Sequence, residues 1–122
     1  MILVDTSVWV DHLRERDPTL AELLVDEQVA GHPFVLGEIA LGHLRQRETV
    51  LAFLADLPQA EVATEAEVLD FIHRQSLFGS GVGYVDCHLL ASAHLTPWGS
   101  LWTRDRRLRA VAERLGIAAR HP

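Results

Sequence analysis

The chain of 122 residues contains no lysine and a single cysteine, Cys87. One cysteine cannot form an intrachain disulfide, and it excludes a structural zinc site built on several cysteines. No apolar run reaches the roughly 18 residues that a membrane-spanning helix needs. The first residues, MILVDTSVWV, have no basic segment before their apolar run, so they do not follow the pattern of a signal peptide. We therefore expect a cytoplasmic protein that enters no membrane.

Positive charge is scarce as well. Against 17 acidic residues stand 11 basic ones, all of them Arg, which gives a formal net charge of −6. Proteins that hold nucleic acid through overall charge are usually basic, so such binding here would depend on local patches or on bound metal. Arg104, Arg106, Arg107 and Arg109 gather around Asp105. This segment is either a solvated helix face or a rim that contacts phosphates.

The remaining composition suits a single folded domain. Hydrophobic residues make up 48% of the chain and the mean hydropathy is +0.10, so we expect one core and one domain over residues 1–122. Short apolar runs that end in turns alternate with segments of helical periodicity. This alternation predicts an α/β fold, a three-layer α/β/α sandwich around a mostly parallel sheet of about four or five strands. The expected strands are residues 2–5, 61–63, 100–103 and 117–119, with helices beginning near residues 6, 18, 35, 49, 64, 84 and 104.

Local signals indicate how these helices begin and end. Thr6 or Ser7 is expected to cap the first helix, and Thr64 with Glu67 has the pattern of a capping box. The apolar stripe of the second helix is expected to extend as far as Val29.

Four acids, Asp5, Glu38, Asp86 and Asp105, lie where apolar segments meet turns or run through helices. Open α/β sheets bind ligands at the carboxyl ends of their strands, and Asp5 ends one expected strand while Asp105 follows another by two residues. Asp86 and Glu38 are expected early in their helices, where the dipole favours a carboxylate. Two carboxylates about 4 Å apart repel by on the order of 4 kcal/mol at an effective dielectric constant of 20. A shared divalent cation removes this repulsion, and oxygen-only ligands favour Mg²⁺ or Mn²⁺.

Each acid also has a structural alternative at this point. Asp86 and Asp105 can cap helices, Asp5 can close a turn, and Glu38 can lie on a solvated stripe. The glycine-rich segment 79–83 lacks the Lys-Ser/Thr of a P-loop, so it is expected to start a helix or act as a lid rather than cradle a phosphate.

Other chemistry is weakly supported. No His-Glu-x-x-His pattern occurs, and His88 and His94 do not share a helical face, so a zinc hydrolase is not expected. Cys87 and His88 would point about 100° apart on a helix, which disfavours a thiol nucleophile. Trp98, between Pro97 and Gly99, is the tryptophan best suited to stack on an RNA base. The other two, Trp9 and Trp102, fall on apolar elements and are expected in the core.

The segments around the four acids carry a resemblance. They read ILVDTS at 2–7, LGEI at 36–39, VDCHLLA at 85–91 and TRDRRL at 103–108. In this order they resemble the four acidic motifs of PIN-domain ribonucleases, in particular the VapC-like toxins of type II toxin–antitoxin systems. The resemblance covers the whole chain. It departs at Cys87 and His88, where such toxins often have small or aliphatic residues.

The resemblance implies a metal-dependent endoribonuclease that cleaves structured or looped RNA by attack of a metal-activated water on a phosphodiester. Asp5, Glu38, Asp86 and Asp105 would be its catalytic acids. Of these, Asp5, Asp86 and Asp105 would bind Mg²⁺ or Mn²⁺, and Glu38 would position or deprotonate the water. The supporting hydroxyls would be Thr6 and Thr103, and the candidate RNA contacts are Arg104, Arg106 and Arg107.

The same resemblance implies partners. A cognate antitoxin would block the acidic site, and the toxin would form a homodimer and a toxin–antitoxin hetero-oligomer. Two other functions stay open from the sequence alone: a PIN nuclease of RNA processing without toxin activity, and a non-catalytic interaction module that keeps the fold.

Overall fold

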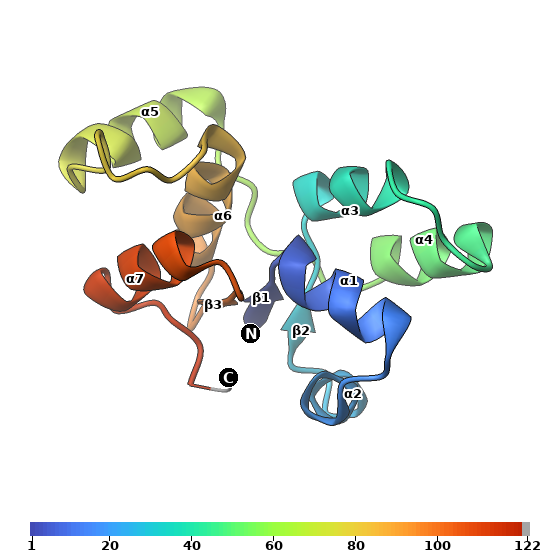
Figure 1. The fold of residues 1–122 in the computed structure, drawn as a ribbon. Helices are drawn as coiled ribbons and strands as arrows, with labels where there is room; N and C mark the ends of the chain where they lie inside the picture. Colours follow the sequence, from blue (N-terminus) through green and yellow to red (C-terminus); the bar gives the residue numbers. More distant parts are fainter. Residues whose placement is uncertain (121–122) are drawn as a thin grey trace.

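The structure, a computed structural model, describes residues 1–120. A parallel sheet lies in the middle, with α1 to α4 on one side and α5 to α7 on the other (Figure 1). The strands are β1 (Ile2–Val4), β2 (Val29–Ala30) and β3 (Ser100–Trp102). The helices are α1 (Thr6–Arg14), α2 (Pro18–Val25), α3 (Pro33–Ala40), α4 (Arg47–Ala55), α5 (Glu65–Arg74), α6 (Tyr84–Leu95) and α7 (Arg106–Arg114).

The sheet has the order β2-β1-β3, and both pairings are parallel. Its three strands are fewer than the expected four or five, although the predicted fold class is confirmed. Single parallel bridges extend the sheet at both edges, from Gly31 to Gln59 and from Leu101 to Ala118. The expected strand at 117–119 is therefore one bridge long. No strand forms at 61–63.

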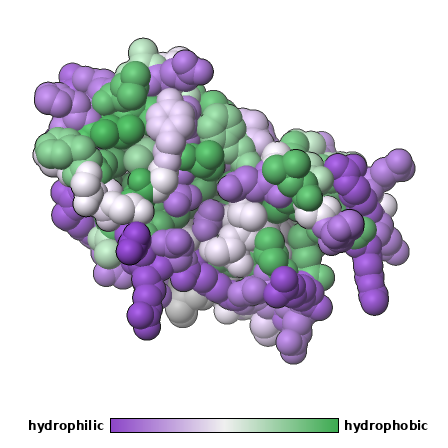
Figure 2. Space-filling model, turned by 45° about the horizontal axis from the view of Figure 1, so that its top comes forward, coloured by the Kyte–Doolittle hydropathy of each residue, from purple (hydrophilic) through white to green (hydrophobic). Residues whose placement is uncertain are grey.

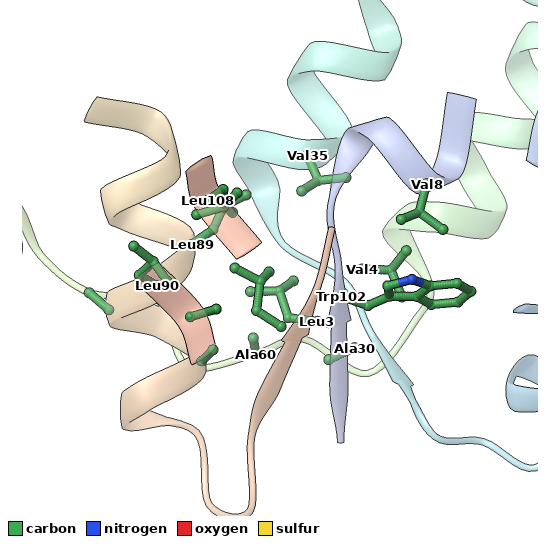
Figure 3. Close-up of a cluster of buried hydrophobic side chains, with 14 of the residues drawn as sticks. Leu3, Val4, Val8, Ala30, Val35, Ala60, Leu89, Leu90, Trp102 and Leu108 are labelled. Carbon is green, nitrogen blue, oxygen red and sulfur yellow. The ribbon is translucent and has the colours of Figure 1, made fainter. Parts of the chain in front are cut away.

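The central strand divides the core, because its side chains alternate between the two faces. Leu3 lies toward Leu89, Leu90 and Leu108 of α6 and α7, whereas Val4 lies toward Trp102 and Val8 (Figure 3). These core side chains are at most 3% exposed. Burying each one contributes roughly 1.5–3 kcal/mol, so the sheet position is fixed from both sides. Trp9 and Trp102 are buried as predicted.

Two helix predictions need correction. The second helix ends at Val25, and Val29 lies in β2, a strand of two residues that is too short to show a period. The helix expected to start at Val35 is α3, which begins two residues earlier at Pro33, a residue suited to a first helical turn. The capping box of Thr64 and Glu67 is confirmed. Within the described part of the chain, none of the helices is long and apolar enough to cross a membrane.

Candidate active site

Asp5 follows β1 at the carboxyl edge of the sheet, and its backbone N–H donates to the carbonyl of Trp102 over 2.9 Å. Asp5 is only 6% exposed. The Oδ2 atom accepts hydrogen bonds from the hydroxyls of Ser7 and Thr103, both at 2.7 Å. Such bonds stabilise a buried carboxylate and fix its direction.

The prediction that Thr6 or Ser7 caps α1 is wrong. Asp5 occupies the N-cap position, and no side chain caps this helix. Both hydroxyls serve acids instead. The role of Ser7 was missed from the sequence, and its position two residues after Asp5 in the Asp-Thr-Ser segment was the available signal.

Glu38 lies in the last turn of α3 and is exposed. This differs from the expected place early in a helix, so the helix dipole does not favour its negative charge. A hydrogen bond replaces that interaction, because the Thr6 hydroxyl donates to Oε1 of Glu38 over 2.7 Å. Thr6 therefore joins the start of α1 to the end of α3.

Asp105 combines two roles that the sequence left as alternatives. It caps α7, since its Oδ1 atom accepts a hydrogen bond from the backbone N–H of Leu108 over 2.9 Å. Its own backbone N–H donates to the Thr103 hydroxyl over 3.1 Å. Thr103 thus touches both Asp5 and Asp105. A capping carboxylate retains a second oxygen, so the cap does not exclude a metal ligand.

Asp86 connects the four acids electrostatically. It lies in the first turn of α6 and is partly buried. Burial raises its pKa to about 6, and the negative charges of Asp5, Asp105 and Glu38 add to this rise. The four carboxylates therefore share one neighbourhood, although they come from four separate segments. None of the four carboxylates forms an ion pair with a basic group within residues 1–120.

The donor set fits a hydrated hard cation. As they stand, no three His, Cys, Asp or Glu side chains within residues 1–120 are close enough to ligate one ion. Mg²⁺ does not require such a cage, because it usually keeps several waters and is held through one or two carboxylates. The predicted ligands Asp5, Asp86 and Asp105 offer carboxylate oxygens, the type of donor that Mg²⁺ and Mn²⁺ prefer.

The arginines predicted to contact RNA differ in their surroundings. Arg104 forms ion pairs with Asp11 and Asp17, so its guanidinium is already engaged. Arg107 lies against the glycine-rich segment: a Cβ added to Gly81 would be 3.0 Å from its Nη1 atom. Gly81 also has a φ of +83°, which favours glycine. Arg106 and Arg107 are exposed near the N-terminus of α7.

The side chains after Asp86 face the core. Burial, together with the charge of Asp86, raises the pKa of the Cys87 thiol, which keeps it protonated and unreactive. His88 is 3% exposed, and its ring packs against Phe34 at 4.6 Å and Tyr84 at 4.7 Å between centroids. Neither ring nitrogen of His88 has a hydrogen-bond partner within the described residues. His88 therefore acts as an aromatic spacer between α3 and α6.

Trp98 lies away from the acids. It precedes β3, so it is at the amino edge of the parallel sheet, and its carbonyl accepts from the N-terminal amine of Met1. Its side chain is 95% exposed. The prediction that Trp98 lies in a loop is confirmed, but its position is unsuited to stacking a base beside Asp5.

A groove of about 720 Å³ begins beside Glu38 and runs between α1 and the connection from α3 to α4. Val10, Leu13 and Ile39 form part of its apolar lining, and Arg14 and Arg45 contribute positive charge. The groove therefore offers an extended binding surface that ends at one of the four acids.

Comparison with known proteins gives a consistent result. The family model of the PIN domain matches residues 2–114 of the sequence. Two relatives named Ribonuclease VapC32, from the CDC 1551 / Oshkosh and H37Rv strains of Mycobacterium tuberculosis, are each 50% identical to the chain over 118 residues. The aligned region covers 97% of this chain and 95% of each relative.

Proposed function

The chain belongs to the PIN-domain family and to its VapC-like branch, and on this premise we propose that it is a Mg²⁺- or Mn²⁺-dependent endoribonuclease acting as a toxin. The observation that carries the proposal is the electrostatic coupling of Asp86 to Asp5, Asp105 and Glu38 at one edge of the sheet. A module that only bound a partner would gain nothing from four carboxylates that repel one another.

In this proposal three of the acids bind the metal ion and the fourth accepts a proton. Asp5, Asp86 and Asp105 would hold the ion, with the Ser7 and Thr103 hydroxyls on Oδ2 of Asp5 turning Oδ1 toward it. The bound metal would lower the pKa of a water and neutralise charge on the scissile phosphate. Glu38 would accept the proton of the attacking water at Oε2, since the Thr6 hydroxyl occupies Oε1. Arg106 and Arg107 would contact the phosphates of a structured or looped RNA.

Two protein partners belong to the proposal. The groove beside Glu38 would receive a segment of a cognate antitoxin, which would keep RNA from the acids. A second copy of the chain would cover the apolar surface on the side of α5, which is visible on the left of Figure 2. The exposed apolar side chains there include Leu69 of α5, Phe78 between α5 and α6, and Tyr84, the first residue of α6.

Cleavage of a looped RNA by the purified protein tests the activity, with Mg²⁺, with Mn²⁺ or with EDTA. We expect cleavage with either metal, none with EDTA, and none by the Asp5→Asn variant. Asp26→Asn is the matched control, because Asp26 is an exposed acid outside the site. Full cleavage by Asp5→Asn, or cleavage that EDTA does not affect, would refute a metal-dependent nuclease. Expression in cells separates a toxin from a processing enzyme, because only a toxin should arrest growth in a manner that Asp5→Asn relieves.

A further inference from the structure

Arg104 lies between two acids of the first two helices. One guanidinium nitrogen contacts Asp11 of α1, and the other lies 2.6 Å from Oδ2 of Asp17, the N-cap residue of α2. Asp17 is held in turn, because its Oδ1 atom accepts the backbone N–H of Leu20 over 3.0 Å. The side chain of Arg104 therefore joins the segment between β3 and α7 to α1 and α2.

The backbone of the same residue belongs to the acidic site. The N–H of Arg104 donates to the Ser7 hydroxyl over 3.0 Å, and that hydroxyl donates to Asp5. The neighbours of Arg104 on either side are Thr103, which also donates to Asp5, and Asp105. One residue thus has its side chain in an ion-pair cluster and its backbone between two members of the proposed metal site.

We propose that Arg104 is a positioning residue: its ion pairs with Asp11 and Asp17 hold the 103–105 segment so that the Thr103 hydroxyl and the Asp105 carboxylate face Asp5. The inference rests on the proposed function for its catalytic consequence. It replaces the prediction that Arg104 contacts RNA. The negative charges of Asp11 and Asp17 offset the positive charge of the guanidinium, which weakens its attraction for a phosphate.

Solvent exposure separates positioning from simple stabilisation. The side chains of Arg104, Asp11 and Asp17 are 38%, 48% and 18% exposed. Ion pairs in which one partner is well exposed contribute little to folding free energy, so losing these pairs should leave the domain folded. The ion pairs instead control the position of the 103–105 segment, whose Thr103 hydroxyl orients Asp5 and whose Asp105 carboxylate is a proposed ligand. Such supporting residues matter because small displacements weaken metal binding and catalysis.

Two variants test the proposal, since both remove the ion pairs of Arg104 and they change the net charge in opposite directions. Arg104→Met and the double variant Asp11→Asn/Asp17→Asn should each lower kcat for RNA cleavage and weaken Mn²⁺ binding, measured by electron paramagnetic resonance, by about 10-fold. KM for RNA should stay within about twofold of the original protein. Arg74→Met is the matched control, because it removes an Arg from an exposed ion pair, with Asp70, on α5.

A direct RNA contact predicts a different pattern. Arg104→Met would then raise KM and reduce the salt dependence of binding by about one charge, with Mn²⁺ affinity unchanged. The double variant Asp11→Asn/Asp17→Asn would lower KM, because it frees the guanidinium from both carboxylates. Either pattern overturns the proposal. A purely structural role would lower the thermal midpoint while kcat and Mn²⁺ affinity of the folded protein stayed normal, which also overturns it.

Backbone amide exchange, followed by nuclear magnetic resonance, keeps the two proposals separate. The amides of Arg104, Asp105 and Leu108 donate within this network, so both variants should exchange them at least about 10-fold faster. This result is independent of activity. If the original protein cleaves no RNA, the proposed function fails while faster exchange still supports the positioning role. Unchanged exchange in Asp11→Asn/Asp17→Asn overturns that role, even if Arg104→Met does not fold.

Discussion

The chain has two groups of acids, Asp11 with Asp17 and Asp86 with Asp5, Glu38 and Asp105, and the environments of Asp17 and Asp86 push their pKa values in opposite directions. The backbone N–H of Leu20, helped by Arg104, lowers the pKa of Asp17. Burial and three neighbouring acids raise the pKa of Asp86 to about 6. The first group, Asp11 and Asp17, is paired within the chain with Arg104, which offsets one of its two negative charges. The second group has no basic partner among residues 1–120, so it is suited to a cation from solution.

Replacing one acid in each group should have opposite effects on stability, and only one should abolish activity. Asp86→Asn is expected to lower RNA cleavage by more than about 100-fold, because it removes a proposed metal ligand. In EDTA at pH 8 the same variant should be more stable. In the original protein folding raises the pKa of Asp86 from 3.8 to about 6, so the ionised side chain disfavours folding by up to about 3 kcal/mol. Because Asp86 is partly solvated, we expect the variant to gain about 1–2 kcal/mol in the free energy of unfolding.

Asp17→Asn completes that comparison. The pKa of Asp17 is lowered, so its ionised form stabilises the fold, and its loss should reduce stability in denaturant unfolding. Asn still caps helices well, so the fall should be modest. Equal stability changes of the same sign for Asp17→Asn and Asp86→Asn would contradict the division into a first group paired with Arg104 and a second group without a basic partner.

A divalent cation should bind among the acids around Asp86 and not at Asp11 and Asp17. Mg²⁺ at about 100 times its dissociation constant is expected to stabilise the folded protein by about 2.7 kcal/mol. Differential scanning fluorimetry with Mg²⁺ and with EDTA measures this as a rise in thermal midpoint. The rise should disappear in Asp86→Asn and persist in Asp26→Asn. A rise of the same size in all three proteins would place the ion elsewhere.

The positions of Asp5 and Asp105 could be predicted because each follows an apolar strand, and the strand pattern fixes which edge of a parallel sheet they occupy. The α/β class followed in the same way from alternating periods. These features depend on local sequence. The two-residue strand β2 was missed, because a pair of apolar residues after a helix carries no period of its own.

The contacts of Arg104 could not be predicted, since they join residues separated by 93 and 87 positions along the chain. The sequence shows four arginines near Asp105 and no sign of which one turns back toward α1 and α2. The hydroxyl of Thr6 was expected to serve a helix cap or an acid, and only the approach of α3 to α1 decides for Glu38. Side-chain partners across elements thus require the assembled fold.

The stability of the protein in EDTA should depend on pH through two opposing groups. Asp86 has a folded pKa of about 6 against 3.8, so acidification from pH 8 to pH 5 stabilises the fold by about 1 kcal/mol. Burial lowers the pKa of His32 from 6.5 to about 4, so the same acidification destabilises the fold by about 2 kcal/mol as the unfolded chain takes up the proton. The effect of Asp86 offsets about half of that of His32, so the original protein should lose about 1 kcal/mol of stability between pH 8 and pH 5.

Asp86→Asn removes one of the two effects. Its stability should therefore fall by about 1 kcal/mol more than that of the original protein between pH 8 and pH 5. Chemical denaturation at the two pH values measures the difference. His32 remains in its buried place in both proteins, bonded to Ser92 and to the N–H of Phe34, so its effect is shared. Parallel pH dependences would mean that Asp86 does not carry the raised pKa.

The smallest expected effect concerns the hydroxyl that orients Glu38. Thr6→Val keeps the shape of the side chain and removes the hydrogen bond to Oε1, so Glu38 loses its fixed direction in the last turn of α3. We expect kcat to fall about fivefold, equivalent to about 1 kcal/mol, with KM and the Mg²⁺-induced rise in thermal midpoint unchanged. Thr6→Ser should restore kcat, because it returns the hydroxyl without the methyl group. A loss of Mg²⁺ stabilisation in Thr6→Val would instead indicate that Glu38 binds the metal ion and is not the residue that positions the attacking water.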